Sequence, residues 1–248
     1  MDKVMLVTGA ALGIGAAVAR LAATHGYAVC INYRNSEEQA LALQADLRRQ
    51  GAAALAVQAD VSSEADVQAL FATVERELGR VSALVNNAGT LERQSRVEGV
   101  NAERLQRVFA TNVFGSFFCC RQAVLRMSTR HGGQGGAIVN VSSAASRLGS
   151  PGEYVDYAAS KGAVDSLTLG LAREVAGEGI RVNAVRPGFI RTGMHALGGE
   201  PGRVDRIGPS LPMGRGGTPE EVAQAIVWLC APEASYVTGA FIDLAGGR

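Results

Sequence analysis

A tyrosine and a lysine stand four residues apart in Tyr157-Ala158-Ala159-Ser160-Lys161, within a stretch expected to be helical. Residues at this spacing share one face of an α-helix, so Lys161 is expected beside Tyr157. A free phenol has a pKa of ~10, and a neighbouring ammonium stabilises the phenolate and lowers that pKa. Tyr157 could then give a proton to an alkoxide forming at a carbonyl, or take one from an alcohol. Alone, the pair is more typical of an ordinary helix surface.

Other polar residues end the predicted strands. Ser142 and Ser143 follow an apolar run, and Asn86-Asn87-Ala88-Gly89 ends another. The carboxyl edge of a parallel sheet is where such folds hold ligands, and a hydroxyl there can orient a carbonyl. Helix capping or turn formation is the alternative for these residues. Asn112 lies in the middle of a predicted helix, where it can bend the helix and hold water, or face solvent.

A glycine-rich turn, Thr8-Gly9-Ala10-Ala11-Leu12-Gly13-Ile14-Gly15, lies between the first predicted strand and the first predicted helix. Glycines allow a sharp turn and a close approach of pyrophosphate to the backbone, and the start of a helix favours anions. The spacing differs from G-x-G-x-x-G, and a tight turn without a ligand is the alternative. The strand–turn–helix context favours a dinucleotide site.

The second predicted strand ends Asn32-Tyr33-Arg34-Asn35-Ser36. An acid at this place favours NAD by binding the ribose 2′-hydroxyl, whereas an arginine accommodates the 2′-phosphate of NADP. The stretch has no acid and one arginine, so NADP(H) is favoured and NAD(H) stays possible. A solvated loop charge is the alternative reading of Arg34.

Two periodicities alternate along the chain. Strands are predicted over 4–8, 27–33, 53–58, 83–86, 137–142, 181–185 and 240–244, and helices over 13–25, 36–50, 64–78, within 101–130, 154–176 and 219–229. Strands that alternate with helices indicate a doubly wound parallel sheet, and apolar runs without strict alternation suit strands covered on both faces. Ser36-Glu37-Glu38-Gln39 has a capping-box pattern. Residues 189–218 lack periodicity, as a substrate lid does.

The composition narrows the class of protein. With 248 residues, 47% hydrophobic residues and a net charge of +1, a single globular domain spanning 1–248 is expected. No block of like charges suggests a nucleic-acid or membrane surface, and we expect no apolar stretch long enough to cross a bilayer. The four cysteines form no CxxC pair. They are expected to be buried, reduced thiols in a cytoplasmic protein, and no metal site is predicted.

Taken together, these motifs resemble the short-chain dehydrogenase/reductase family in its single-domain branch, over essentially the whole chain. Residues 8–15 resemble its TGxxxGxG turn, and residues 86–89 match NNAG. Asp60 and Val61 resemble the pair that meets adenine, and residues 187–192 match PG-x-I-x-T beside nicotinamide. The residues that match its Asn–Ser–Tyr–Lys tetrad are Asn112, Ser143, Tyr157 and Lys161.

The resemblance implies a three-layer α/β Rossmann fold with a seven-stranded parallel sheet of order 3-2-1-4-5-6-7. It implies a homotetramer built through the helices around Asn112 and Tyr157 and through the C-terminal strand. The serine would orient the substrate, the tyrosine would transfer the proton, and the lysine would hold the ribose and tune the tyrosine. The asparagine would support a water relay. We assign the serine role to Ser143 and expect Ser142 to bond structurally.

The resemblance also implies a set of cofactor contacts. NADP-preferring members often carry a basic residue before the middle glycine of the turn, where this chain has Leu12, so the preference for NADP(H) rests on Arg34. The implied contacts are Gly9, Ala11, Leu12, Gly13, Ile14, Asn32, Tyr33, Arg34, Asp60, Val61, Asn87, Ala88, Gly89, Tyr157, Lys161, Pro187, Gly188, Ile190 and Thr192.

The implied function is an oxidoreductase that transfers a hydride between nicotinamide and a secondary alcohol or ketone. The overall pattern resembles glucose 1-dehydrogenase-like and 3-oxoacyl-carrier-protein reductase-like members, so a sugar, a 3-oxoacyl group or another small carbonyl is expected as substrate. The alternative is an NAD(P)-binding sensor or scaffold protein that keeps the fold without turnover.

Overall fold

The computed structural model describes residues 3–248 and contains a parallel sheet with the strand order β3-β2-β1-β4-β5-β6-β7. Every neighbouring pair of strands is parallel. The predicted fold class and strand order are confirmed. The seven strands are β1 (Val4–Val7), β2 (Ala28–Tyr33), β3 (Ala54–Gln58), β4 (Ala83–Asn86), β5 (Gly136–Val141), β6 (Ile180–Pro187) and β7 (Phe241–Leu244).

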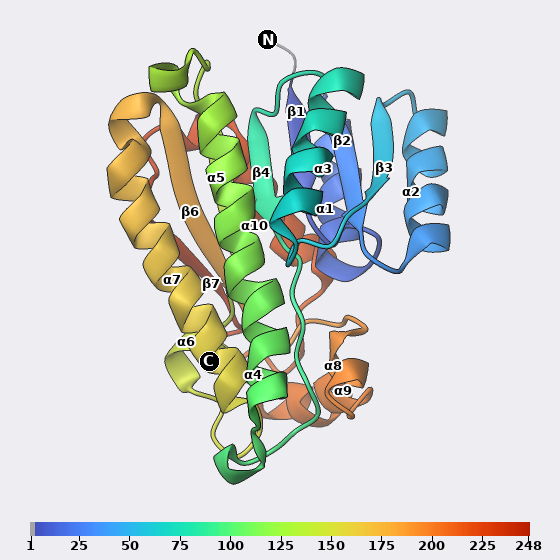
Figure 1. Ribbon diagram of the computed structural model, residues 1–248. Coiled ribbons are helices and arrows are strands. Elements are labelled where there is room, and N and C mark those ends of the chain that lie inside the picture. The colour runs from blue at the N-terminus through green and yellow to red at the C-terminus, as the bar shows by residue number, and fades with distance from the viewer. Residues whose placement is uncertain (1–2) are drawn as a thin grey trace.

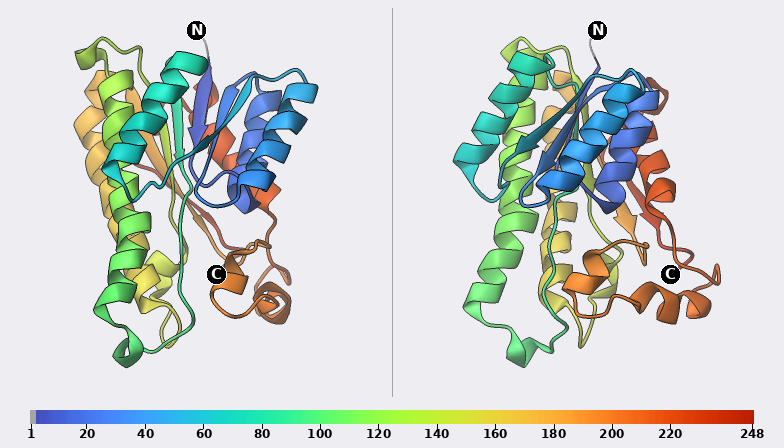
Figure 2. Two further views of the ribbon diagram at one scale, coloured as in Figure 1. Left: turned by 45° about the vertical axis from the view of Figure 1, so that its right-hand side comes forward. Right: turned by 90° about the vertical axis from the view of Figure 1, so that its right-hand side faces the viewer.

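Helices cover both faces of this sheet, which makes three layers (Figures 1 and 2). Met5 and Val7 of β1 pack into one core with α1 (Gly13–Thr24), α2 (Glu37–Arg49) and α10 (Pro219–Cys230). Val4 and Leu6 pack into the opposite core with α3 (Glu64–Glu77), α5 (Gly115–Met127) and α7 (Val155–Val175). Because both faces are buried, the four successive residues of β1 are all apolar.

The long helix predicted within residues 101–130 is interrupted. It consists of α4 (Ala102–Phe109), a π-helical turn η2 (Ala110–Phe114) that contains Asn112, and α5. A Cβ on Gly115, the first residue of α5, would lie 2.8 Å from Val61 Cγ2, so the helix passes close to the end of β3. Single π-helical turns inside α-helices are frequent at functional sites.

One expectation about this helical run needs correction. By length and composition, Ala102–Met127 is apolar enough to cross a membrane, with a mean hydropathy of 1.3. The expectation that no apolar stretch is long enough to cross a bilayer is therefore wrong. Half of the apolar window is buried inside the fold. Figure 1 shows the run lying along the sheet beside α7, as a core helix does.

The segment 189–218 lies beyond the carboxyl ends of the strands (Figure 1). It contains two short helices, α8 (Met194–Leu197) and α9 (Arg203–Ile207), and a 3-10 turn, η5 (Gly208–Ser210). Its role as a lid stays a prediction. The remaining short elements are α6 (Ala145–Leu148) and the turns η1 (Val97–Gly99), η3 (Thr129–His131), η4 (Ala176–Glu178) and η6 (Pro232–Ala234).

The capping box expected at Ser36 does not form. Ser36 precedes α2 with a ψ of 59° and makes no side-chain hydrogen bond to the helix. A capping residue normally has extended backbone, which aims its side chain at the first turn. The box occurs instead at α10, where Thr218 and Glu221 hydrogen-bond each other's backbone N–H groups.

Thr8 ties the glycine turn to the loop after β4. Its hydroxyl oxygen accepts hydrogen bonds from the N–H groups of Asn87 and Ala88, both at 3.0 Å. The Asn87 side chain donates in return to the carbonyl oxygens of Thr8, at 2.9 Å, and Gly9, at 3.0 Å. Two motifs about eighty residues apart are therefore held in one rigid unit.

Replacing Thr8 tests this link. Thr8→Val keeps the shape but leaves the Ala88 N–H without its acceptor, while the Asn87 N–H keeps only the Val85 carbonyl at 3.0 Å. We therefore expect a loss of roughly 1–3 kcal/mol in the free energy of unfolding. Thr8→Ser keeps the hydroxyl and should lose much less. Urea unfolding measures both, and equal stability of the valine variant and the wild type would contradict the link.

Candidate active site

The glycine turn has the geometry of a phosphate cradle. Gly9 and Gly13 have φ values of +59° and +57°, in the left-handed region that favours glycine. A Cβ on Gly9 would lie 2.9 Å from Ala88 Cα, and one on Gly15 would lie 2.7 Å from the Gly9 carbonyl oxygen. Leu12 precedes α1 and offers no side-chain cap. The uncapped start of α1 therefore suits an anion such as pyrophosphate.

The side chain of Asn32 hydrogen-bonds the backbone of this turn. It is 1% exposed, its Oδ1 accepts from the Gly9 N–H at 3.2 Å, and its Nδ2 donates to the Ala59 carbonyl at 3.0 Å. The Ala10 N–H donates to the Asn32 carbonyl at 2.8 Å. The side-chain amide of Asn32 thus makes its hydrogen bonds to other protein groups. Its predicted contact with a cofactor stays a prediction.

Arg34 and Asp60 lie after the carboxyl ends of β2 and β3. The Arg34 side chain is 54% exposed, and its Nη1 lies 3.7 Å from Asp60 Oδ2. The other oxygen of Asp60 accepts from the Ser62 hydroxyl at 2.7 Å and from the Ser62 N–H at 2.9 Å. An exposed ion pair of this length is weak. Arg34 can therefore turn toward a more strongly charged partner.

Tyr157 and Lys161 lie together in the first half of α7, both largely buried at 9% and 3% exposure. Lys161 Nζ lies 5.6 Å from the centroid of the Tyr157 ring and donates to the Val141 carbonyl at 2.8 Å. A Cβ on Gly89 would lie 3.5 Å from the same Nζ. The ammonium therefore sits between the ends of β4 and β5 and the phenol, as the spacing predicts.

Burial controls the protonation of this pair. Burial raises the pKa of Tyr157 to about 12, while a hydrogen bond with Ser143 acts to lower that pKa. Burial lowers the pKa of Lys161 to about 8, and the nearby Asp165 carboxylate acts to raise that pKa. The expectation of a lowered phenol pKa does not hold in the protein alone, because desolvation outweighs the lowering effect of Ser143. At neutral pH the phenol is protonated and the amine is mostly charged.

The two serines after β5 have different partners. The Ser142 hydroxyl is buried and donates to the Lys161 carbonyl at 3.2 Å. The Ser143 hydroxyl oxygen accepts from the Ala145 N–H at 3.1 Å, and its hydroxyl donates to the Pro187 carbonyl at 3.5 Å. Ser143 is also close enough to Tyr157 to act on the pKa of that phenol. Ser142 therefore bonds structurally, as expected, and Ser143 is the serine beside the phenol.

Asn112 joins the π-helical turn to two other elements. It is fully buried, its Oδ1 accepts from the Thr90 N–H at 2.8 Å, and its Nδ2 donates to the Thr90 carbonyl at 2.9 Å. The same Nδ2 donates to Ser160 Oγ at 3.0 Å, one residue before Lys161. The side-chain amide holds the loop after β4 against α7, and its part in a water relay stays a prediction.

The segment after β6 approaches the glycine turn. The Gly188 N–H donates to the Leu244 carbonyl at 3.0 Å, and a Cβ on Gly188 would lie 2.9 Å from Ala245 Cα. A Cβ on Gly13 would lie 3.3 Å from Thr192 Cγ2. Predicted site residues from several separate segments therefore lie at the carboxyl edge of the sheet. No group of three or more metal-ligating side chains occurs among residues 3–248.

Comparisons with known proteins agree with this arrangement. The family model described as enoyl-(acyl carrier protein) reductase matches residues 9–248. An uncharacterised oxidoreductase of Escherichia coli, YgfF, is 59% identical over 245 residues, covering 99% of both chains. The 3-oxoacyl-[acyl-carrier-protein] reductase FabG of Staphylococcus aureus is 36% identical and covers 100% of this chain and 98% of its own.

A short-chain dehydrogenase/reductase of Serratia marcescens, solved as a mutant with two substitutions, superposes with a TM-score of 0.89 at 33% identity, covering 99% of this chain and 97% of its own. This chain belongs to the short-chain dehydrogenase/reductase family. As a short-chain dehydrogenase/reductase, it is an enzyme that acts on a CH–OH or carbonyl group with a nicotinamide cofactor. The predicted similarity to 3-oxoacyl-carrier-protein reductases is confirmed.

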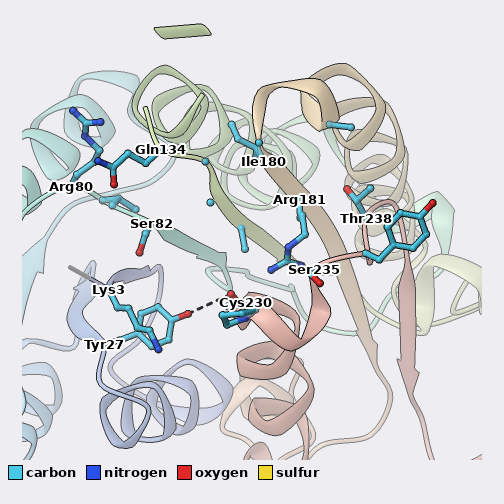
Figure 3. A pocket seen from close by; sticks show the side chains of 18 residues that line it. Lys3, Tyr27, Arg80, Ser82, Gln134, Ile180, Arg181, Cys230, Ser235 and Thr238 are labelled. Carbon is cyan, nitrogen blue, oxygen red and sulfur yellow. Dashed lines mark hydrogen bonds between the residues drawn. The ribbon is translucent and has the colours of Figure 1, made fainter. Parts of the chain in front are cut away.

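A cavity of this short-chain dehydrogenase/reductase lies away from these residues, at the amino edge of the sheet (Figure 3). It measures about 1060 Å³, and Lys3, Arg80 and Arg181 line it. Arg181 donates to the carbonyls of Leu229, at 2.7 Å, and Ala231, at 3.2 Å, so it caps the end of α10. Its side chain supports the fold, and the site residues lie at the opposite edge.

A buried ion pair beside Tyr157 was not predicted. Arg104 Nε donates to Asp156 Oδ2 at 2.6 Å and Nη2 to Oδ1 at 3.0 Å, with side chains 10% and 2% exposed. Burial acts to raise the pKa of Asp156, but the hydrogen bonds and charge of Arg104 prevail and hold that pKa below its usual value. The pair joins α4 to the start of α7. No motif marks it, because its members are 52 residues apart.

Removing one partner of this pair should be costly. Arg104→Met leaves the Asp156 charge buried alone, so we expect roughly 3–5 kcal/mol less stability at pH 7, whereas Arg104→Met/Asp156→Leu should recover most of it. Asp156 has a lowered pKa when folded, so the wild-type contribution is present above the unfolded pKa of ~3.9 and disappears as the pH falls through the folded value.

Urea unfolding from pH 7 to pH 3 measures this dependence. The wild type should lose more stability on acidification than the double variant. Equal losses in the two proteins would show that the pair does not hold the start of α7.

Proposed function

We propose that this enzyme is an NADP(H)-dependent dehydrogenase/reductase that interconverts a ketone and a secondary alcohol, with Tyr157 as the proton donor and acceptor. The observation that carries the proposal is the buried phenol with the Ser143 side chain near it and the Lys161 ammonium 5.6 Å from its ring centroid. The relatives described above are named as oxidoreductases, and FabG by its name reduces a 3-oxoacyl group.

The nicotinamide cofactor, when bound, supplies or accepts the hydride. The glycine turn and the start of α1 would hold its pyrophosphate, and the Lys161 ammonium would hold the ribose. Ser143 orients the substrate carbonyl. Tyr157, whose pKa is near 12, stays protonated at neutral pH and gives its proton to the carbonyl oxygen. In the reverse direction Tyr157 takes the proton of the alcohol, and the Lys161 charge favours the phenolate that forms.

The preference for NADP(H) rests on Arg34. Its side chain is 54% exposed, and the weak pair with Asp60 leaves it able to bind the 2′-phosphate. Leu12, which is 58% exposed, adds no positive charge at the turn. NAD(H) therefore remains the competing cofactor. We expect the preference for NADP(H) over NAD(H) to come from the single guanidinium of Arg34.

We also propose that residues 1–248 form one domain with residues 189–218 as its lid, and that the protein is a cytoplasmic homotetramer. Exposed apolar side chains on the helices around Asn112 and Tyr157 support the assembly: Phe114, Phe117, Leu125, Val155 and Leu169. Trp228 of α10 and Tyr236 before β7 are also exposed. All four cysteines are free and buried, as reducing surroundings require.

Removing the phenol hydroxyl tests the proton role. We expect Tyr157→Phe to lower kcat by at least about a hundredfold, because general acid catalysis contributes at least that much, and to leave NADPH binding nearly intact. Ser143→Ala should lower kcat/KM, while Ser142→Ala, its matched control one residue away, should affect mainly stability. Steady-state kinetics measure kcat and kcat/KM, and the thermal shift with NADPH measures cofactor binding. Substantial turnover by Tyr157→Phe would refute the proposal.

Replacing the arginine tests the cofactor preference. Arg34→Ala should raise the KM for NADPH about ten- to a hundredfold, since a charged hydrogen bond to phosphate contributes roughly 1.5–3 kcal/mol, and should leave the KM for NADH nearly unchanged. Arg49→Ala, on the exposed end of α2, serves as a charge control. An equal change for both cofactors, or none, would contradict the assignment.

A further inference from the structure

The Tyr157 ring belongs to a small cluster of apolar and aromatic side chains. Leu91 from the loop after β4 and Tyr154 from the start of α7 are buried against it, at 8% and 6% exposure. Ala145 of α6 and Met194 of α8 pack against the same cluster. These residues come from separate elements that meet at the Tyr157 ring's cluster. Any carbonyl that reaches the Tyr157 hydroxyl must bring its flanking atoms against this cluster.

The segment carrying α8 is docked closely on the cluster. A Cβ on Gly198, at the end of α8, would lie 2.9 Å from Leu91 Cδ1 and would also collide with the Tyr154 hydroxyl. The Tyr154 hydroxyl donates to the Gly198 carbonyl at 3.4 Å. The only side-chain hydroxyl of the cluster besides Tyr157 is therefore already bound, and Met194 of the same segment packs against the cluster.

The charged side chains of the same segment have partners. Arg203, which is only 4% exposed, binds Glu153 and also Glu200, the latter at 2.9 Å. Glu200 accepts in addition from Arg206 and Gln94. His195 hydrogen-bonds the Ile190 carbonyl at 3.0 Å. These groups neutralise one another, so they offer no unpaired charge to a substrate.

We propose that the substrate of this enzyme is an uncharged ketone, or the matching alcohol, with hydrocarbon on both sides of the reacting carbon, and that Leu91 and Met194 select it. The inference rests on the proposed function, since it concerns the same phenol. A polyhydroxylated ketone or sugar would leave a hydroxyl unpaired against the cluster. One such hydroxyl weakens binding about ten- to a hundredfold. Hydrocarbon at the same place is favoured by burial.

The selection is testable with two ketones and two kinds of variant. With NADPH, we expect the wild-type kcat/KM for 4-phenyl-2-butanone to exceed that for dihydroxyacetone by at least about a hundredfold, and D-glucose with NADP+ to be a poor substrate. Leu91→Ser and Met194→Ser should lower kcat/KM for the phenyl ketone about ten- to a hundredfold. Met194→Leu should retain most of it. Leu197→Ser, on the same short helix but 59% exposed, is the matched control and should change little.

The outcomes separate this inference from the proposed function. Efficient turnover of dihydroxyacetone or glucose in preference to the phenyl ketone would overturn the apolar substrate class while leaving the role of Tyr157 intact. If Met194→Ser lowered kcat/KM equally for both ketones, the selecting role of Met194 would be overturned. An unchanged melting temperature of the variant excludes misfolding as the cause of the lower kcat/KM. No turnover of any carbonyl by protein that binds NADPH would refute the proposed function and this inference with it.

Discussion

The site depends on an ammonium buried beside a buried phenol. Removing an amine and a phenol from water is costly for their charged forms. Here the cost is visible as a pKa of about 8 for Lys161 and about 12 for Tyr157. The two groups therefore stand in the protonation states that a proton donor and its supporting charge require at neutral pH. The fold must hold them a few ångströms apart while excluding water, and the surrounding polar contacts serve this geometry.

Three sets of hydrogen bonds hold the elements that carry these groups. Thr8 and Asn87 join the glycine turn to the end of β4. Asn112 joins the loop after β4 to α7 through Thr90 and Ser160. Arg104 and Asp156 fix the start of α7 one residue before Tyr157. Each set links segments that are distant in sequence, so the positions of the phenol and the glycine turn are coupled through buried and partly buried hydrogen bonds.

Much of this arrangement follows from local sequence. The apolar runs and helix periods predict the layers, and the glycines predict a sharp turn, in which Gly9 and Gly13 have positive φ. Tyr157 and Lys161 are placed by helical spacing alone. The raised pKa of Tyr157 could not be predicted in this way, since it depends on burial by side chains from several elements. The partners of Asp156 and Asn112 are likewise products of tertiary packing, and no local pattern indicates them. At Ser36 a local pattern predicts a side-chain cap that does not form, because the backbone geometry of Ser36 overrides the pattern.

The most direct measurement of the central claim is the titration of the Tyr157 phenol itself. Tyrosine labelled with ¹³C can be followed by NMR as the pH rises, and the Tyr157→Phe variant assigns the signal. The account predicts a titration near pH 12 in the protein alone, and a fall in that pKa when NADP+ is added. A phenol that titrates near its free value of ~10 in both states would place Tyr157 in water and contradict the account.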